Sequence, residues 1–115
     1  MKQVSVINEN DIEQFTFASV KVRELFKTDD PSISVAEINL SGENDKNKNT
    51  GSDMFYYVIE GNGRFIINDK EYAVKKGSLV FIPKGASYQD IGELKMISLA
   101  IPKFDQKNVV FLNGK

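Results

Sequence analysis

The segment FYYVIEGNGRFIINDKEYAVKKGSLVFIPKG, residues 55–85, decides the fold class. It contains four short runs rich in β-branched and aromatic residues: FYYVIE (55–60), RFIIN (64–68), EYAV (71–74) and SLVFI (78–82). Turn-forming residues follow each run, namely GNG at 61–63, NDK at 68–70, KKG at 75–77 and PKG at 83–85. Short strands separated by such turns are typical of a β-sandwich or barrel. The segment therefore predicts an all-β fold, in which GNG makes a tight hairpin turn.

The same rhythm continues on both sides of this segment. Strands are predicted over VSVI (4–7), FTFA (15–18), VKVRELF (20–26) and ISVAEINL (33–40), with a turn at DDPS (29–32), and over LKMISLAI (94–101). No linker or internal repeat interrupts the 115 residues, a length that suits one domain. We therefore expect a single domain over residues 1–115.

Composition and charge narrow the expected partners. The formal net charge is -1, which gives no electrostatic reason to expect nucleic acid or an anionic membrane surface as a partner. No apolar run has the length needed to span a bilayer, and MKQVSVINENDIEQF lacks the apolar core of a signal peptide. We expect a cytoplasmic protein with neither a nucleic-acid nor a membrane partner.

The chain has no cysteine and no histidine. Disulfides, thiol nucleophiles and serine–histidine catalysis are therefore excluded. Almost every site for a transition metal is removed as well, because such ions bind mainly through imidazole and thiolate groups. We expect no metal and no other cofactor.

Alternating residues give the expected strands two apolar faces. In 54–60, Met54, Tyr56, Val58 and Glu60 share one face; the opposite face, continued in the neighbouring run, carries Phe55, Tyr57, Ile59, Leu79 and Phe81. One face should line the interior of a barrel, and the other needs a cover. Because little chain remains for that cover, we expect a homodimer, although the N-terminal strands could also supply it.

The stretch GENDKNKNTGSDMFYYVIEG, residues 42–61, resembles the first motif of the cupin superfamily. That motif reads Gly, five residues, His-x-His, three or four residues, Glu, six residues, Gly. Here Gly42, Lys48, Thr50, Met54 and Gly61 stand in that frame. GSLVFIPKGASYQDIG, residues 77–92, resembles the second motif, with Gly77, Pro83, Gly85, Tyr88 and Gly92 at its key positions.

The resemblance covers residues 33–110, which we expect to form the conserved barrel core, preceded by N-terminal strands over 1–32. It implies a cupin barrel, that is, a jelly-roll or double-stranded β-helix of two antiparallel sheets. In metal-binding cupins, the two histidines, the glutamate and the second-motif histidine hold a divalent metal. Lys48, Thr50, Met54 and Tyr88 stand in their places, so the resemblance implies a cupin scaffold without its metal site.

Tyr88 has the strongest functional claim among the remaining residues. The resemblance places it at the barrel mouth, where it could donate a hydrogen bond or act as a general acid; filling the vacated metal pocket is an equal alternative. The expected ligand-binding set is Tyr88, Tyr56, Met54, Val58, Met96 and Lys48. Lys48 belongs to ENDKNKNT (43–50), which we expect to be a solvated loop, or else a flap that brings Lys48 to an anionic ligand.

Three functions remain open from the sequence. The favoured one is a metal-free cupin that binds a small molecule in its central cavity, with catalysis left undetermined. The second is a metal-independent isomerase, epimerase or lyase that acts on a sugar or small organic acid, with Tyr88 as the acid or base. The third is a structural or accessory protein of a metabolic pathway. A polar pocket with a titrating tyrosine favours the second function, and a filled barrel favours the third.

Overall fold

The computed structural model describes residues 4–26 and 31–112. Nearly all regular structure in these residues is strand; two 3-10 turns, η1 (Glu9–Asp11) and η2 (Gln106–Asn108), are the helical elements. Within the described residues, no helix is long and apolar enough to cross a membrane. The strands are β1 (Phe15–Phe17), β2 (Val20–Phe26), β3 (Ser34–Glu43), β4 (Asn47–Asn49), β5 (Asp53–Ile67), β6 (Lys70–Lys75), β7 (Leu79–Ile82), β8 (Ser87–Ile101) and β9 (Val109–Phe111).

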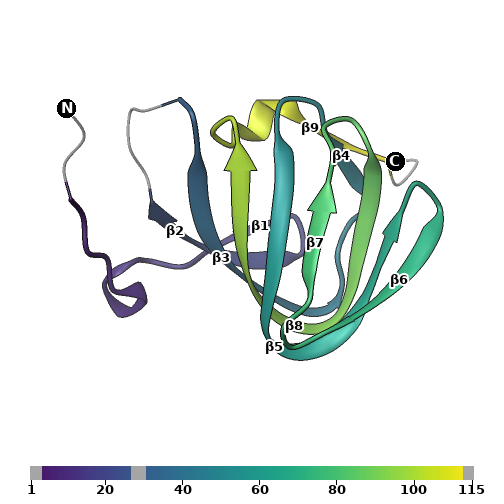
Figure 1. The fold of residues 1–115 in the computed structure, drawn as a ribbon, viewed down its shortest axis with the longest axis horizontal. Helices are drawn as coiled ribbons and strands as arrows, with labels where there is room; N and C mark the ends of the chain where they lie inside the picture. Colours follow the sequence, from purple (N-terminus) through teal and green to yellow (C-terminus); the bar gives the residue numbers. More distant parts are fainter. Residues whose placement is uncertain (1–3, 27–30, 113–115) are drawn as a thin grey trace.

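Two long strands, β5 and β8, hold the barrel together (Figure 1). They pair antiparallel along almost their whole length, from Asp53 opposite Ile101 to Ile67 opposite Tyr88. β8 also pairs with β3 and β4, and β5 pairs with β6 and β7. Because both strands bend, the sheet curls over and its two layers are hydrogen-bonded into one nine-stranded antiparallel sheet. The predicted all-β barrel is confirmed.

The prediction of a hairpin turn at GNG (61–63) is wrong. These residues lie where β5 bends, and the bend explains why glycines are found there. Residues 61–63 lie inside β5, where the register with β8 shifts between Val58 and Glu60. Gly61 has φ +93°, and a Cβ there would overlap the carbonyl oxygen of Glu93. The glycine is therefore required because two strands cross closely at a positive φ. The true hairpin, between β5 and β6, turns at Asn68 and Asp69, which also have positive φ.

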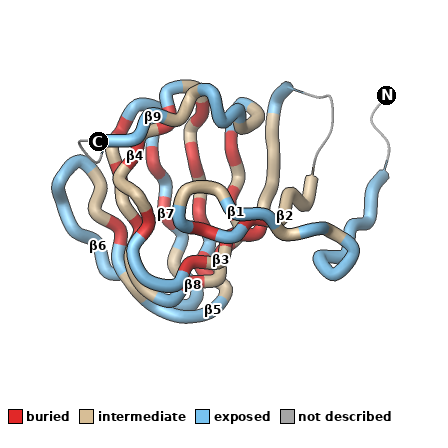
Figure 2. The backbone as a smooth tube through the Cα atoms, turned by 180° about the vertical axis from the view of Figure 1, so that it is seen from behind, coloured by how far each residue is buried: buried red, intermediate tan, exposed pale blue. Residues whose placement is uncertain are grey.

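The alternating inward and outward residues predicted from the sequence match the buried and exposed positions on β5 and β7. On β5, Met54, Tyr56 and Val58 are buried, and on β7 Val80 and Ile82 are buried. Figure 2 shows the buried positions running along the strands that face the barrel interior. The predicted N-terminal strand VSVI (4–7) is wrong: residues 4–7 form no strand, and Val4 and Val6 are almost fully exposed. Part of the predicted turn at 29–32 lies outside the described residues.

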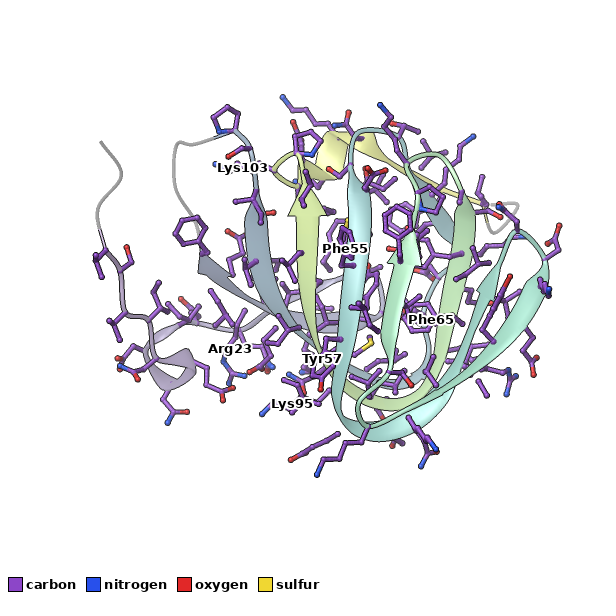
Figure 3. All side chains as sticks on the ribbon, viewed as in Figure 1. Arg23, Phe55, Tyr57, Phe65, Lys95 and Lys103 are labelled. Atoms are coloured by element: carbon purple, nitrogen blue, oxygen red, sulfur yellow. The ribbon has the colours of Figure 1, made fainter. Side chains whose placement is uncertain are left out.

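The outer face of β5 and β7 is apolar and open to solvent in this chain. Tyr57 is 47% exposed, Leu79 is 63% exposed and Phe81 is 51% exposed. Phe55 packs against Phe81, with ring centroids 4.9 Å apart. Figure 3 shows Phe55 and Tyr57 along β5. The described part of the N-terminal segment, from residue 4 on, leaves these side chains exposed, and the homodimer stays a prediction.

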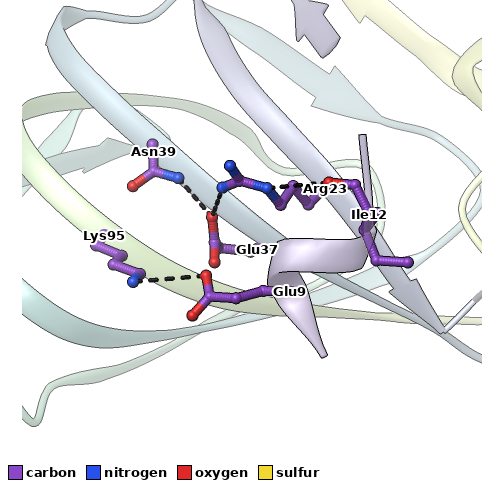
Figure 4. A network of polar contacts seen from close by, with 6 residues as sticks. All are labelled: Glu9, Ile12, Arg23, Glu37, Asn39 and Lys95. Carbon is purple, nitrogen blue, oxygen red and sulfur yellow. Dashed lines mark hydrogen bonds and ion pairs between the residues drawn. The ribbon is translucent and has the colours of Figure 1, made fainter. Parts of the chain in front are cut away.

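A polar network fixes the N-terminal segment on the same outer face (Figure 4). The Arg23 guanidinium of β2 donates to the buried Glu37 carboxylate of β3 at 2.7 Å and to the Ile12 carbonyl at 3.2 Å. The Asn39 amide also donates to Glu37, at 2.7 Å. Arg23 therefore points away from the barrel interior, where it secures an otherwise unpaired buried charge.

Candidate functional site

A cavity of about 620 Å³ opens within the curled sheet. Its walls come from the β1–β2 hairpin, from β3, β5 and β8, and from the C-terminal segment 103–111. Three aromatic side chains meet where the hairpin faces that segment: Phe17 packs edge-on against Phe104 at 5.7 Å and lies 6.1 Å from Phe111. The volume lies within the usual range for small-molecule sites.

Two buried tyrosines line the cavity. The hydroxyls of Tyr56, on β5, and Tyr88, on β8, lie 2.6 Å apart. Each residue is only 6% exposed, and the ring of Phe65 packs against both. Burial raises the pKa of both phenols above the usual value, and the Asp90 carboxyl nearby adds to the effect. Both tyrosines are therefore protonated at neutral pH and act as neutral hydrogen-bonding groups.

Asp90 follows two residues after Tyr88 on the inward face of β8 and is 2% exposed. The Asn44 amide nitrogen donates to Asp90 Oδ1 at 2.9 Å, and the Asn44 backbone N–H donates to the Asp90 carbonyl oxygen at 2.9 Å. Burial raises the pKa of Asp90, although the Asn44 hydrogen bond opposes that shift. A hydrogen bond from the Asp90 backbone also opposes the shift, and a carboxylate with about four acceptor sites keeps acceptor capacity beyond these two donors.

Further buried polar residues line the same cavity. Asn47 of β4 is the register partner of Tyr88, and Ser98 of β8 is the register partner of Tyr56. We define the polar cluster as the six buried polar residues that line the cavity: Asn44, Asn47, Tyr56, Tyr88, Asp90 and Ser98. The cavity therefore combines a few buried polar groups with mostly apolar walls, an arrangement that orients a ligand through a few fixed hydrogen bonds.

The structure corrects the predicted frame of the first motif by one residue. The resemblance placed Lys48 and Thr50 at the ligand positions of the first motif, but along β4 the buried residues are Asn47 and Asn49. Lys48 is half-buried on the opposite side of the strand, and Thr50 is exposed. The expectation of a solvated loop over 43–50 is wrong for the same reason, because it contains β4 and three buried asparagines.

The side chains at these inward positions do not suit a transition metal. Asn49 Oδ1 accepts from the backbone N–H groups of Gly51 and Ser52, each at 2.9 Å, and its amide nitrogen donates to the Met54 sulfur at 3.6 Å. Asn49 is thereby committed to shaping the turn into β5. Asn47, Met54 and the protonated Tyr88 offer an amide, a thioether and a phenol, which are weak ligands. Among the described residues, no three acidic side chains gather into a group that could hold a metal ion.

The predicted ligand-binding residues divide into two groups. Tyr88, Tyr56 and Met54 line the cavity. Val58 and Met96 are fully buried core residues, and neither they nor Lys48 contribute to the described cavity lining. A contact of any of these residues with a ligand stays a prediction.

Sequence reasoning missed Asn44, Asn47, Asp90 and Ser98. Strand parity contained a signal for two of them: Asp90 follows Tyr88 by two residues, and Ser98 follows Met96 by two. The asparagines gave no comparable signal, because ENDKNKNT has the composition of an exposed loop.

The comparisons with known proteins agree with this architecture. A family model described as "Cupin domain" matches residues 36–89, a range that includes β4, β5 and the start of β8. Solved cupin-like barrels superpose on nearly the whole chain. The family-model match and the superposed barrels together support the cupin superfamily and show a cupin-like barrel fold.

Two solved structures show how closely the barrel is shared. The cupin-like nucleoside dehydratase Pac13 of Streptomyces has a TM-score of 0.87 and 19% sequence identity, with 96% of this chain and 92% of Pac13 covered; other structures contain PAC13 variants with uridine. KdgF from Halomonas has a TM-score of 0.80 and 13% identity, with 91% and 99% covered. An uncharacterised protein of Methanocaldococcus jannaschii, MJ1618, is 24% identical over 92 residues, 76% of this chain and 74% of MJ1618. At these identities, the solved structures show a common fold.

Proposed function

We propose that this cupin binds a small molecule in its barrel cavity and does so without a bound metal. One observation carries the proposal: a cavity of about 620 Å³ is lined in part by buried polar side chains, with the Tyr56 and Tyr88 hydroxyls 2.6 Å apart. A purely structural barrel would be filled by apolar side chains, because buried polar groups cost stability. The cavity therefore supports ligand binding over a purely structural or accessory role.

Uridine is the first probe to test, because structures of the similar barrel of PAC13 contain it. Sugars and small organic acids complete the panel. Calorimetry should show saturable binding of at least one member, with one site per chain. Loss of the Tyr88 hydroxyl in Tyr88→Phe should weaken affinity by one hydrogen bond, about 0.5–1.5 kcal/mol, or about two- to tenfold.

Tyr57→Phe is the matched control, because Tyr57 lies half-exposed on the outer face of the same strand as Tyr56. It should leave the affinity unchanged. Equal affinities of wild type and Tyr88→Phe would place the ligand away from the polar cluster and contradict the proposal. Failure of every panel member to bind would contradict it as well.

Catalysis is the second candidate function, favoured by the paired hydroxyls beside a buried carboxyl. Because the pKa of Tyr88 is raised, Tyr88 would serve as a general acid and not as a base. An isomerase, epimerase or lyase moves a proton at carbon, so incubation of a bound panel member in D₂O should incorporate deuterium. A ligand that binds and is recovered without deuterium would assign the protein a binding role alone.

We also propose that two copies pair through the outer face of β5 and β7. Tyr57, Leu79 and Phe81 form an exposed apolar surface there, and the ring of Phe55 packs against that of Phe81. Soluble monomers rarely expose large continuous apolar patches. Light scattering should give twice the 12.9 kDa chain mass, and Leu79→Glu should give the single chain. A wild-type protein of 12.9 kDa at micromolar concentration would contradict the dimer.

A further inference from the structure

Asp90 is the group in the cavity that the proposed binding of a small molecule does not by itself explain. It is 2% exposed, and no ion pair within the described part of the chain joins it to lysine or arginine. A buried carboxyl without a cation costs folding free energy that an apolar residue at the same place would not. A group of this kind in a cavity points to a role in recognising a ligand.

Asn44 fixes the orientation of the Asp90 carboxyl. The backbone N–H groups of Ser19 and Asp45 donate to Asn44 Oδ1, at 3.2 and 2.8 Å. Since this oxygen is occupied, the Asn44 amide nitrogen must face Asp90, and it donates to Oδ1 at 2.9 Å. A carboxylate has about four acceptor sites, so acceptor capacity remains for a ligand in the cavity.

The charges around the cavity favour an uncharged ligand. The described residues that line it carry three carboxylates, Glu24, Asp90 and Asp105, and one ammonium group, Lys103. The hydroxyls of Tyr56 and Tyr88 add neutral donors and acceptors. An anion placed against this polar cluster would meet either a like charge in a poorly screened site or a carboxyl that must first take up a proton.

We infer that Asp90, oriented by Asn44, determines which ligands the cavity accepts: uncharged molecules that donate hydrogen bonds through hydroxyl groups, and not anions. The inference rests on the proposed small-molecule binding. It narrows the panel, because hydroxyl-rich molecules such as nucleosides and sugars fit, whereas organic acids and phosphate esters do not. Asp90 thereby acts as a specificity-determining residue, and Tyr56 and Tyr88 supply the neighbouring hydroxyl contacts.

Matched pairs of probes test this inference: uridine against uridine monophosphate, and glucose against glucose 6-phosphate, each titrated at pH 8. For the pair that binds, the neutral member should bind wild type about tenfold or more tightly than its phosphate. Asp90→Asn keeps the size of the side chain and its ability to accept from Asn44, and should reduce the preference to about threefold or less.

Glu93→Gln removes the same charge from an exposed position on the same strand, outside the cavity, and should keep the full preference. If Asp90→Asn fails to fold, Asp90→Ser removes the charge with a smaller side chain and should give the same loss of preference. A phosphate that binds wild type as tightly as its neutral partner would overturn the inference, as would a preference that both Asp90 variants retain; the proposed binding would stand in each case. If neither member of any pair binds, the proposed function fails for these classes and the inference fails with it.

Discussion

Removing one hydroxyl from the Tyr56–Tyr88 pair should cost more stability than removing both. The two oxygens lie 2.6 Å apart, and both residues are 6% exposed. Tyr88→Phe loses one hydrogen bond, about 0.5–1.5 kcal/mol net, and leaves the Tyr56 hydroxyl unpaired, with a desolvation penalty of about 1–3 kcal/mol. We therefore expect each single variant to lose about 2–3 kcal/mol of unfolding free energy.

The double variant Tyr56→Phe/Tyr88→Phe leaves no unpaired hydroxyl and should lose no more than either single variant. Urea denaturation measures these differences as shifts of the midpoint at constant slope. Tyr57→Phe, on the exposed outer face, should change stability by about 0.5 kcal/mol or less. Additive losses in the double variant, or single losses no larger than that of Tyr57→Phe, would show that the hydroxyls do not depend on each other and would refute the reasoning.

Three further predictions concern the scaffold and its buried charges. Gly61→Ala should lower the free energy of unfolding by about 2–5 kcal/mol, because a Cβ would both strain a positive φ and overlap the backbone of β8. Gly77→Ala, with φ +92° and open space around it, should lower it by about 1–2 kcal/mol. Equal losses of the two variants in thermal denaturation would contradict the close crossing of β5 and β8 at Gly61. Arg23→Met should lower the free energy of unfolding by about 1.5–3 kcal/mol, because it leaves the Glu37 carboxylate buried without its cation. An unchanged midpoint of urea denaturation would show that this ion pair does not contribute to stability. The pKa of Asp90 is raised in the folded state, so the stability associated with this group is complete below its unfolded pKa and is lost as pH rises through its folded value. Asp90→Asn should therefore be more stable than wild type at neutral pH, and this difference should vanish in acid; an Asp90→Asn variant less stable than wild type at pH 7 would contradict the sign.

The fold was predictable because its signals are local. A period of two along MFYYVIE (54–60) separated the inward Met54, Tyr56 and Val58 from the outward Phe55 and Tyr57. Turn residues marked most strand ends for the same reason, since their φ preferences act within a few residues. The resemblance of the two motifs to those of cupins then implied the kind of barrel.

GNG at 61–63 shows where local signals fail. A glycine at positive φ serves a hairpin and a bent strand equally well, and the choice depends on β8, whose Glu93 carbonyl lies against Gly61. That contact joins residues 32 positions apart in the sequence. Nothing within residues 61–63 indicates it.

The site was harder to predict than the fold. Asn47 and Asn49 are inward because β4 pairs with β8 and β9, and a shift of one residue in the motif frame exchanges them for Lys48 and Thr50. The alternation of side chains along each strand could place Tyr56 and Tyr88 on inward faces. The contact between their hydroxyls could not be predicted, because it depends on β5 and β8 lying side by side. Asp90 was missed because a carboxylate on an inward position runs against the usual pattern for a buried strand.

A crystal structure of the protein grown with the tightest-binding panel member tests the central claim most directly. We predict ligand density inside the barrel, with a polar ligand atom within about 2.6–3.2 Å of the Tyr88 hydroxyl, a normal hydrogen-bond distance. A cavity collapsed around the side chains of the polar cluster, or a ligand bound only outside the barrel, would contradict it.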